Sequence, residues 1–327
     1  MGVGRGFRAA GEESVRTCCG RTTRAALYAA AVTLGCVAGG GCASFPVATI
    51  AAVGDRPAVT TATAPVADKR TKVWQAERLD RGYVVILPGS WGETAADHGI
   101  VDGLVAAGID AAIEIYAWPA GDFPAGVFMV PYNLRATTRN RGQAREVAAR
   151  IVRYQKDHPG RPVHLIGYSG GGGIAAWTLE ELPADTRIAS AVLLAPTLSY
   201  TYDFSRALAH TERGIDSFYS LYDVPVMMAG CSIVGTTDGT HWPAGGAVGF
   251  RQPPAVVGES AVVRQHPYTL SMLGGGHPGG HYGWTREGFV AEHVAPLLVA
   301  GGAVRSTGAP AAEPPLQAAA ATGTTIR

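Results

Sequence analysis

The stretch of sequence that decides the fold is VHLIGYSGG, residues 163–171. Its first four residues are mostly apolar and predict a strand buried on both faces. The next five match the pattern G-x-S-x-G, and a helical pattern follows over residues 174–182. A serine on a sharp turn between a strand and a helix needs small neighbours, because Cβ atoms there would clash. The stretch therefore predicts a strand–turn–helix unit with Ser169 as a nucleophile.

The alternation of strand and helix continues on both sides of this unit. Apolar runs ended by turn residues predict strands, and a period near 3.6 predicts helices. The predicted strands are residues 83–87, 111–115, 163–166, 191–194 and 217–220, and the predicted helices are residues 94–107, 142–156 and 174–182, with a closing helix that begins at residue 289. This order predicts an α/β fold with a mostly parallel sheet flanked by helices. Pro296 is expected to kink or end the closing helix.

Two further stretches bear on the architecture. About 20 residues separate Pro196 from the next strand, which leaves no room for a large cap domain there. Residues 224–260 are rich in glycine and proline, and their pattern predicts no clear element.

Residues 87–92, LPGSWG, follow the first predicted strand. Together with the serine motif, this loop resembles the oxyanion loop and nucleophile turn of the α/β-hydrolase superfamily, and the resemblance covers residues 72–300. It implies a hydrolase that uses a serine, a carboxylate and a histidine, in that chain order. The chemistry requires all three, because a serine hydroxyl becomes a good nucleophile only when an oriented base removes its proton.

Two histidines are candidates for the base, and both lie in GGGHPGGH, residues 274–281. The resemblance places the histidine just before the last helix, which favours His281 over His277. The other histidines fit less well: His98 and His293 fall on predicted helices, and His164 lies inside a predicted strand, where a core role is expected.

Two aspartates are candidates for the orienting acid. Asp223 ends FYSLYD, residues 218–223, and so follows a late strand, as the resemblance requires. Asp238 lies in GTTDG, residues 235–239, which is typical of a turn in which aspartate bonds to its own backbone. Asp223 is therefore preferred, with Asp238 as the alternative. Asp203 ranks third, because its setting predicts a helix N-cap.

An acyl-transfer site also needs N–H groups that stabilise the oxyanion, each worth roughly 3 kcal/mol. The residue after the nucleophile, Gly170, is expected to supply one. The loop at residues 87–92 is expected to supply the other through the backbone of Ser90, with Trp91 as the alternative.

No cofactor or metal is predicted. His277 and His281 are separated by Pro-Gly-Gly, which prevents a helix from aligning them on a zinc ion. The glycines at residues 170–173 lack the lysine and hydroxyl residue of a phosphate-binding P-loop. Cys231 lies in an apolar setting that predicts a buried thiol. A net charge of +1 gives no argument for a nucleic-acid partner.

The two ends of the chain are not expected to join the folded domain. Residues 1–42 combine arginines with a short apolar run at residues 25–34, which is typical of an export signal. Cys36 and Cys42 follow small residues, so lipidation at either one and ordinary cleavage are both open. Residues 43–71 predict a flexible linker, residues 72–300 the hydrolase domain, and residues 301–327 a disordered tail.

These observations together predict an exported serine hydrolase that cleaves carboxylic esters or related acyl bonds through an acyl-serine. The expected substrate is a small-molecule or lipid ester, with residues 116–132 and 224–260 shaping the acyl pocket. The expected location is the periplasm, the cell envelope or the medium, with membrane anchoring if a cysteine carries lipid. An acyltransferase or peptidase of the same fold, or an inactive surface-binding lipoprotein, stays as an alternative, and the sequence does not indicate an oligomeric state.

Overall fold

A computed structural model describes residues 72–121, 123–251 and 262–299. The predicted signal, linker and tail lie outside the described residues, and so do Cys36 and Cys42. Within the described ranges, no helix combines the length and the apolar character needed to cross a bilayer.

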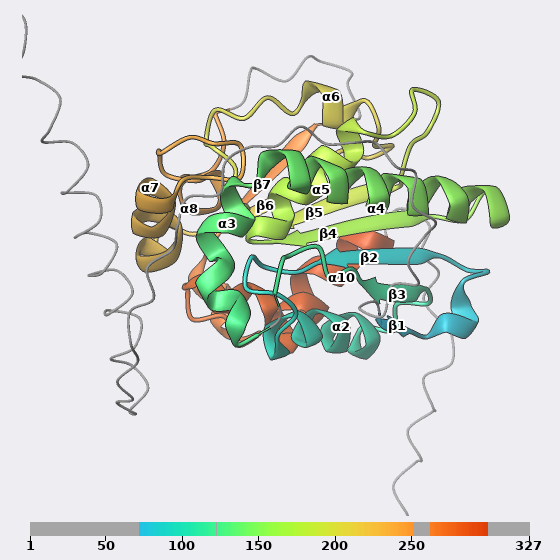
Figure 1. Ribbon diagram of the computed structural model, residues 1–327. Helices are drawn as coiled ribbons and strands as arrows, with labels where there is room; N and C mark the ends of the chain where they lie inside the picture. The colour runs from blue at the N-terminus through green and yellow to red at the C-terminus, as the bar shows by residue number, and fades with distance from the viewer. Residues whose placement is uncertain (1–71, 122, 252–261, 300–327) are drawn as a thin grey trace, which may run out of the picture. The chain divides into compact units, whose positions relative to one another are not determined.

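The described residues form a seven-stranded sheet in the order β1-β3-β2-β4-β5-β6-β7 (Figure 1). The strands are β1 (Lys72–Trp74), β2 (Tyr83–Leu87), β3 (Ala112–Ile115), β4 (Val163–Tyr168), β5 (Ser190–Leu194), β6 (Ile215–Tyr219) and β7 (Val263–Pro267). Only β1 pairs antiparallel, and every other neighbouring pair is parallel. The prediction of an α/β fold with a mostly parallel sheet is confirmed.

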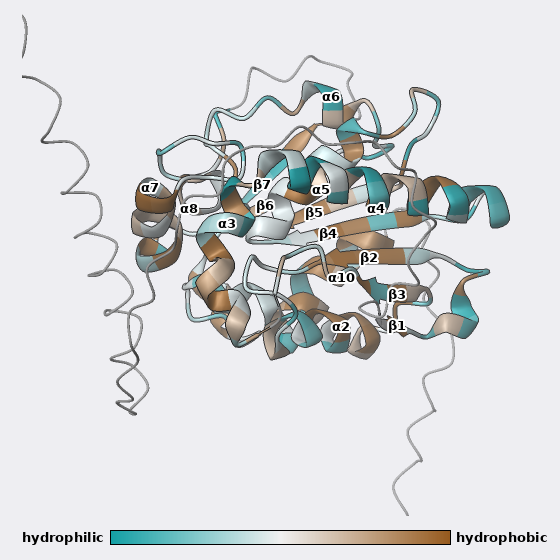
Figure 2. Cartoon of the chain, viewed as in Figure 1, coloured by the Kyte–Doolittle hydropathy of each residue, from teal (hydrophilic) through white to brown (hydrophobic). Residues whose placement is uncertain are grey.

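Helices cover both faces of the sheet (Figure 1). One face carries α4 (Thr137–Asp157) and α5 (Gly170–Glu180), and the other carries α2 (Ala95–Ala106) and the C-terminal helical segment. Figure 2 shows the consequence, because the central strands are brown while the outer side of α4 is largely teal. Every residue of β2, β4 and β5 is buried, as expected for parallel strands between two helical layers.

Helices α2 and α4 follow the predicted patterns closely. Thr94 caps α2: its hydroxyl accepts a hydrogen bond from the Ala96 N–H, and Asp97 accepts one from the Thr94 N–H in return. Helix α4 buries one apolar face, as predicted, but begins at Thr137, five residues earlier than expected. Between β5 and β6 the chain forms loops and the short helix α6 (Ser205–Leu208), so no large cap domain lies there.

The two outermost strands were not predicted. β1 has only three residues, too few to show a period. β7 reads VRQHP and is only partly buried, because it lies at the edge of the sheet. Two of its polar side chains bind Asp216 of β6, Arg264 at 2.7 Å and His266 at 2.8 Å. Because these residues are polar, this edge strand shows no apolar run in its sequence.

The start of α5 corrects a prediction. The pattern placed the helix at residues 174–182, but it begins at Gly170, directly after the nucleophile candidate. Four glycines disfavour a helix by intrinsic propensity. Here close packing requires them: a Cβ on Gly172 would stand 2.7 Å from Pro196, and one on Gly173 would stand 2.7 Å from Thr237. Tertiary packing therefore overrides the local preference.

Residues 224–251 contain three short helices that the sequence did not predict: the π-helix η3 (Val224–Gly230), α7 (Cys231–Val234) and α8 (Gly245–Val248). The closing segment also differs from expectation. It begins at Glu287 and runs through α9 (Glu287–Phe289), η6 (Val290–Val294) and α10 (Ala295–Val299). Pro296 does not end it. The wider π turn of η6 comes just before the proline, whose missing N–H and bulky ring disturb regular α-helical bonding.

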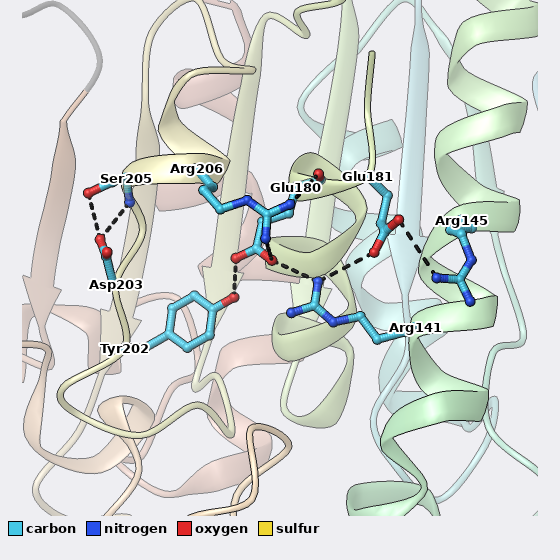
Figure 3. A network of polar contacts seen from close by, with 8 residues as sticks. All are labelled: Arg141, Arg145, Glu180, Glu181, Tyr202, Asp203, Ser205 and Arg206. Carbon is cyan, nitrogen blue, oxygen red and sulfur yellow. Dashed lines mark hydrogen bonds and ion pairs between the residues drawn. The ribbon is translucent and has the colours of Figure 1, made fainter. Parts of the chain in front are cut away.

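A polar network fastens α4 and α5 to the segment before α6 (Figure 3). Glu180 is its centre: it binds Arg141 at 2.7 Å and accepts a hydrogen bond from the Tyr202 hydroxyl at 2.5 Å. Arg206 lies 3.8 Å from the same carboxylate. Because the Glu180 side chain is almost fully buried, these partners offset the cost of burying its charge.

Candidate active site

Ser169 occupies the sharp turn between β4 and α5. Its φ of 54° and ψ of −119° place it in a backbone region that non-glycine residues rarely adopt. The turn is held in place because the Ser169 N–H donates to the Leu194 carbonyl at 2.8 Å and the Thr197 N–H donates to the Ser169 carbonyl at 3.1 Å. Both flanking glycines are required: a Cβ on Gly167 would stand 2.6 Å from the Gly171 carbonyl oxygen, and one on Gly171 would stand 2.1 Å from that of Leu87.

Three side chains from separate segments meet at this turn. His281 Nε2 lies 3.1 Å from Ser169 Oγ, and His281 Nδ1 lies 2.6 Å from Asp223 Oδ2. Ser169 follows β4, Asp223 follows β6, and His281 begins η5 (His281–Thr285). All three are nearly buried, with exposed fractions of 8%, 1% and 7% for serine, aspartate and histidine. The structure thus brings together the three residues that the sequence favoured.

This geometry suits proton transfer. A histidine whose Nδ1–H points at a carboxylate presents a free Nε2 lone pair to the serine hydroxyl. Ser169 keeps a small exposed fraction, whereas the Asp223 carboxylate is almost fully buried. The arrangement can therefore activate Ser169 as a nucleophile.

Tyr168, the variable residue of the serine motif, also supports His281. Its ring lies against the imidazole with centroids 5.1 Å apart, and its hydroxyl donates to the His281 carbonyl at 3.3 Å. Burial raises the pKa of Tyr168 well above its ordinary value, so this hydroxyl stays protonated and can donate. The sequence reasoning missed this contact, because nothing in the pattern marks the residue between Gly167 and Ser169.

His277, the alternative base, lies elsewhere. It is fully buried among aromatic rings, with Trp284 at 4.0 Å and Tyr268 at 4.8 Å between centroids. Its Nδ1 accepts a hydrogen bond from the Gly279 N–H at 2.9 Å. Burial lowers its pKa to about 4, so it is held neutral. Its contacts are those of a core residue.

The other histidines also occupy structural positions. His98 lies on α2 and contacts Glu93 at 2.7 Å. His164 is buried in β4 with its Nδ1 2.9 Å from Ser190 Oγ, and burial lowers its pKa to about 3. His293 lies on the closing helix, as expected.

Asp238, the alternative acid, is bound to other partners. It accepts hydrogen bonds from the Ser199 N–H at 2.9 Å, the Ser199 hydroxyl at 2.5 Å and the Thr236 hydroxyl at 2.6 Å. The expectation that it bonds to its own backbone is wrong, because its partner within the turn is the Thr236 hydroxyl and its other partner, Ser199, lies 39 residues away. Asp203 was predicted to cap a helix, but the N-cap of α6 is Phe204; Asp203 lies one residue earlier and accepts from the Ser205 N–H at 2.9 Å.

The predicted oxyanion loop packs against the start of α5. A Cβ on Gly89 would stand 3.6 Å from that of Ser169, and a Cβ on Gly170 would stand 2.0 Å from Ser90 Oγ. Ser90 is buried, and its hydroxyl has no hydrogen-bond partner among the described residues. Ser90 and Gly170 are therefore neighbours beside the nucleophile candidate, as the prediction requires.

Two buried side chains hold this loop, and the sequence reasoning missed both. Trp118 Nε1 donates to the Pro88 carbonyl at 2.7 Å, and Asn133 Nδ2 donates to the Ser90 carbonyl at 2.8 Å. Trp118 comes from the aromatic loop expected to shape the pocket, and Asn133 comes from α3 (Val130–Arg135). A polar residue in a short apolar segment was the only available signal for Asn133.

The described residues contain no group of three or more side chains suited to hold a metal ion. Cys231 is buried in α7, and burial raises its pKa to about 12, so it is a protonated thiol at neutral pH.

The fold and the site together define a class. A mostly parallel sheet with an antiparallel first strand, a serine on a strained turn after a central strand, and an acid and a histidine after later strands are the features of the α/β-hydrolase fold.

Comparisons with known proteins give likenesses of low sequence identity and low structural similarity. No protein-family model matches the chain, and no curated protein matches it. Among solved structures, the chain is similar to lipase B of Aspergillus fumigatus, with 14% identity, a TM-score of 0.43, and coverage of 72% of this chain and 57% of that one. It is also similar to a dienelactone hydrolase of Anabaena variabilis, with 14% identity, a TM-score of 0.40, and coverage of 68% and 85%. The chain thus spans little more than half of the lipase's length, and the assignment of the fold rests on the sheet order and the serine turn.

Proposed function

We propose that the protein is a serine hydrolase that cleaves carboxylic esters or related acyl bonds through an acyl-serine intermediate. The observation that carries the proposal is the continuous hydrogen-bonded path from Ser169 Oγ through His281 to Asp223, with contacts of 3.1 and 2.6 Å. This path begins at a serine on a strained turn, and strained backbone is concentrated at functional sites.

In the proposed reaction, Ser169 Oγ attacks the ester carbonyl carbon while its proton passes to His281 Nε2. Asp223 accepts the Nδ1–H and stabilises the imidazolium that forms. When the tetrahedral intermediate collapses, the proton on Nε2 goes to the leaving alcohol, and the acyl group remains on Ser169. Water then repeats the sequence: it loses a proton to Nε2, attacks the acyl carbon and releases the acid, and the proton returns to Ser169.

The negative oxygen of each tetrahedral intermediate is held by the backbone N–H groups of Gly170 and Ser90. Ser90 is preferred over Trp91 because its side chain lies against Gly170. Its hydroxyl, which is buried without a partner among the described residues, is available as a third donor. A donor aimed at the charge that develops in the transition state lowers the barrier more than it strengthens substrate binding.

The proposal is tested with Ser169→Ala. Turnover of p-nitrophenyl butyrate should fall by about 10⁶, the scale seen when a nucleophilic serine is removed. The melting temperature should stay within a few degrees, because the substitution removes one nearly buried hydroxyl and no packed group. A fluorophosphonate should label the wild-type protein and not the variant. Equal turnover by the variant would refute the role of Ser169, and a panel of esters and anilides graded by acyl length would define the substrate class.

The proposal extends to location. The arginines and the apolar run of residues 1–42 support export, either by ordinary cleavage or with lipid on Cys42 or Cys36. Mass spectrometry of the protein from its native cell should find a chain without Met1. An intact N-terminus on a protein recovered from the cytoplasm would contradict export.

A further inference from the structure

The loop of residues 88–92, called here the oxyanion loop, serves the proposed reaction only if its N–H groups point the right way. Each trans peptide carries its C=O and its N–H on opposite sides of one rigid plane. Whatever holds the C=O of one residue therefore also sets the direction of the N–H of the next. The partners of the loop's carbonyl groups thus determine where its N–H groups point.

Three consecutive carbonyl groups of the loop each have a donor. The Pro88 carbonyl accepts from Trp118 Nε1 at 2.7 Å, the Gly89 carbonyl from the Gly92 N–H at 3.2 Å, and the Ser90 carbonyl from Asn133 Nδ2 at 2.8 Å. The middle bond is internal to the turn. The two outer bonds come from side chains outside it, so the loop does not set its own orientation.

Asn133 is the more constrained of these two side chains. It is fully buried, and both of its amide atoms are in use. Its Oδ1 accepts from the Ala120 N–H at 2.8 Å, and its Nδ2 also donates to the Ala120 carbonyl at 3.1 Å. Its own carbonyl accepts from Asn140 Nδ2 at 2.5 Å. The side-chain amide thus joins the oxyanion loop to the aromatic loop with both of its protons in use, and the backbone carbonyl of the same residue joins the start of α4.

We infer that Asn133 is a positioning residue for the oxyanion loop, an inference that rests on the proposed function. Its Nδ2 holds the Ser90 carbonyl, and the Gly92 N–H ties the Gly89 carbonyl, whose plane carries the Ser90 N–H, into the same turn. Asn133 therefore keeps the whole turn in place beside Ser169 and Gly170. Without that donor, the buried Ser90 carbonyl has no partner and must turn to find one. The turn then shifts with it, and the N–H of Ser90 no longer meets the oxyanion. A displacement of about 1 Å at such a site costs about 10²-fold in rate.

Two variants test the inference. Asn133→Leu keeps the branched shape and the number of heavy atoms of the side chain and removes the donor at every pH. Asn133→Asp keeps the shape, but only its protonated form can donate to the Ser90 carbonyl. The readouts are kcat and KM for p-nitrophenyl butyrate and the inhibition constant of butylboronic acid, which forms a tetrahedral adduct with the serine and so reports on the oxyanion site.

We expect Asn133→Leu to lower kcat by about 10²-fold and to weaken the boronate by a similar factor, with KM within a few-fold of wild type. For Asn133→Asp, the ratio of its kcat/KM to that of wild type should rise as the pH falls from 9 to 6, because protonation restores the donor. Melting temperatures of both proteins over the same pH range show whether they stay folded, and a merely structural role would lower the ratio only where the variant unfolds.

Thr211→Val is the matched control. Thr211 is also fully buried, and its hydroxyl donates to the Leu208 carbonyl at 3.0 Å, away from the oxyanion loop. This variant should lose stability but keep both kcat and boronate affinity within threefold of wild type.

The outcomes separate the two claims. If wild type turns over ester and a folded Asn133→Leu matches it in kcat and boronate affinity, the inference is wrong and the proposed function stands. If the leucine variant does not fold, the aspartate variant decides, and a ratio constant at one from pH 6 to 9 overturns the inference. A wild-type protein with neither ester turnover nor boronate binding would overturn the proposed function itself.

Discussion

Two carboxylates of the same loop-rich region, Asp223 and Asp238, have opposite surroundings. Asp238 accepts hydrogen bonds from three neutral donors supplied by Ser199 and Thr236. Asp223 Oδ2 binds His281, and its Oδ1 has no hydrogen-bond partner among the described residues. Asp238 is thus hydrogen-bonded by hydroxyl and backbone donors, whereas the Asp223 side chain has only the His281 imidazole as a partner among the described residues. The difference shows that two aspartates close in sequence can be told apart by their partners, since Asp223 contacts His281 and Asp238 does not.

The surrounding segments explain this difference. The Ser220 hydroxyl donates to the Gly279 carbonyl at 2.6 Å, which fastens the loop after β6 to the loop that carries His281. Asp223 comes three residues later, and its N–H donates back to the Ser220 carbonyl at 3.1 Å. Asp238 instead fastens its turn to the loop after β5, where Thr197 and Ser199 lie. One carboxylate therefore faces the histidine, and the other closes a neighbouring loop.

Among the substitutions that test this comparison, Asp223→Asn should have the largest effect. Turnover of p-nitrophenyl butyrate should fall by about 10⁴, because the imidazole loses the charge that orients it and stabilises its protonated form. Fluorophosphonate labelling of Ser169 should slow in parallel, while the melting temperature changes little. If turnover of Asp223→Asn stays within tenfold of wild type, Asp223 does not have the role that distinguishes it from Asp238.

Asp238→Asn should have a smaller effect of a different kind. Asparagine retains one acceptor, so we expect turnover to fall less than tenfold and the free energy of unfolding to fall by about 1 kcal/mol, as charge-assisted hydrogen bonds become neutral ones. Urea unfolding measured beside steady-state kinetics separates these effects. If this variant is the inactive one, Asp238 has a role that its contacts do not reveal.

The loop that carries the two histidine candidates, residues 274–281, extends the comparison. A substitution of His277 there should have the smallest effect on turnover at neutral pH. His277 has its pKa lowered to about 4 by burial, whereas an unfolded histidine titrates near 6.5. Between these values the unfolded chain binds a proton that the folded chain does not, so stability is present above pH 6.5 and is lost as the pH falls toward 4. This single group contributes a slope of up to about 1.4 kcal/mol per pH unit.

His277→Asn tests this point. Its side-chain oxygen can still accept from the Gly279 N–H, but the residue no longer titrates. The slope of unfolding free energy against pH between 6 and 4.5 should become shallower, and turnover at pH 7.5 should stay within threefold of wild type. An unchanged slope would show that His277 is not held neutral, and a turnover loss near that of Asp223→Asn would place it in the chemistry.

Different parts of the molecule were predictable to different degrees. The unit around Ser169 was predictable because strand, turn and helix are adjacent in sequence and each leaves a local pattern. The start of α5 was not, because four glycines disfavour a helix until Pro196 and Thr237 pack against them. Strand β7 was missed because an edge strand with polar side chains shows no apolar run. Asn133 was missed because it is distinguished only by its hydrogen bonds with Ser90 and Ala120, and no spacing in the sequence predicts these contacts.

By itself, the sequence determined that the chain folds as a mostly parallel α/β domain and that Ser169 lies on a turn between a strand and a helix. These features follow from hydrophobic periodicity and turn chemistry, which act over a few residues. It also narrowed the histidine and the acid to two candidates each. Only the tertiary structure decided which of them meet, because Asp223 and His281 are 58 residues apart and their contact depends on how two loops pack together. The hydrogen bonds from Trp118 and Asn133 to residues 88–92 likewise belong to the tertiary structure, because these side chains reach the loop only after the sheet and helices have assembled.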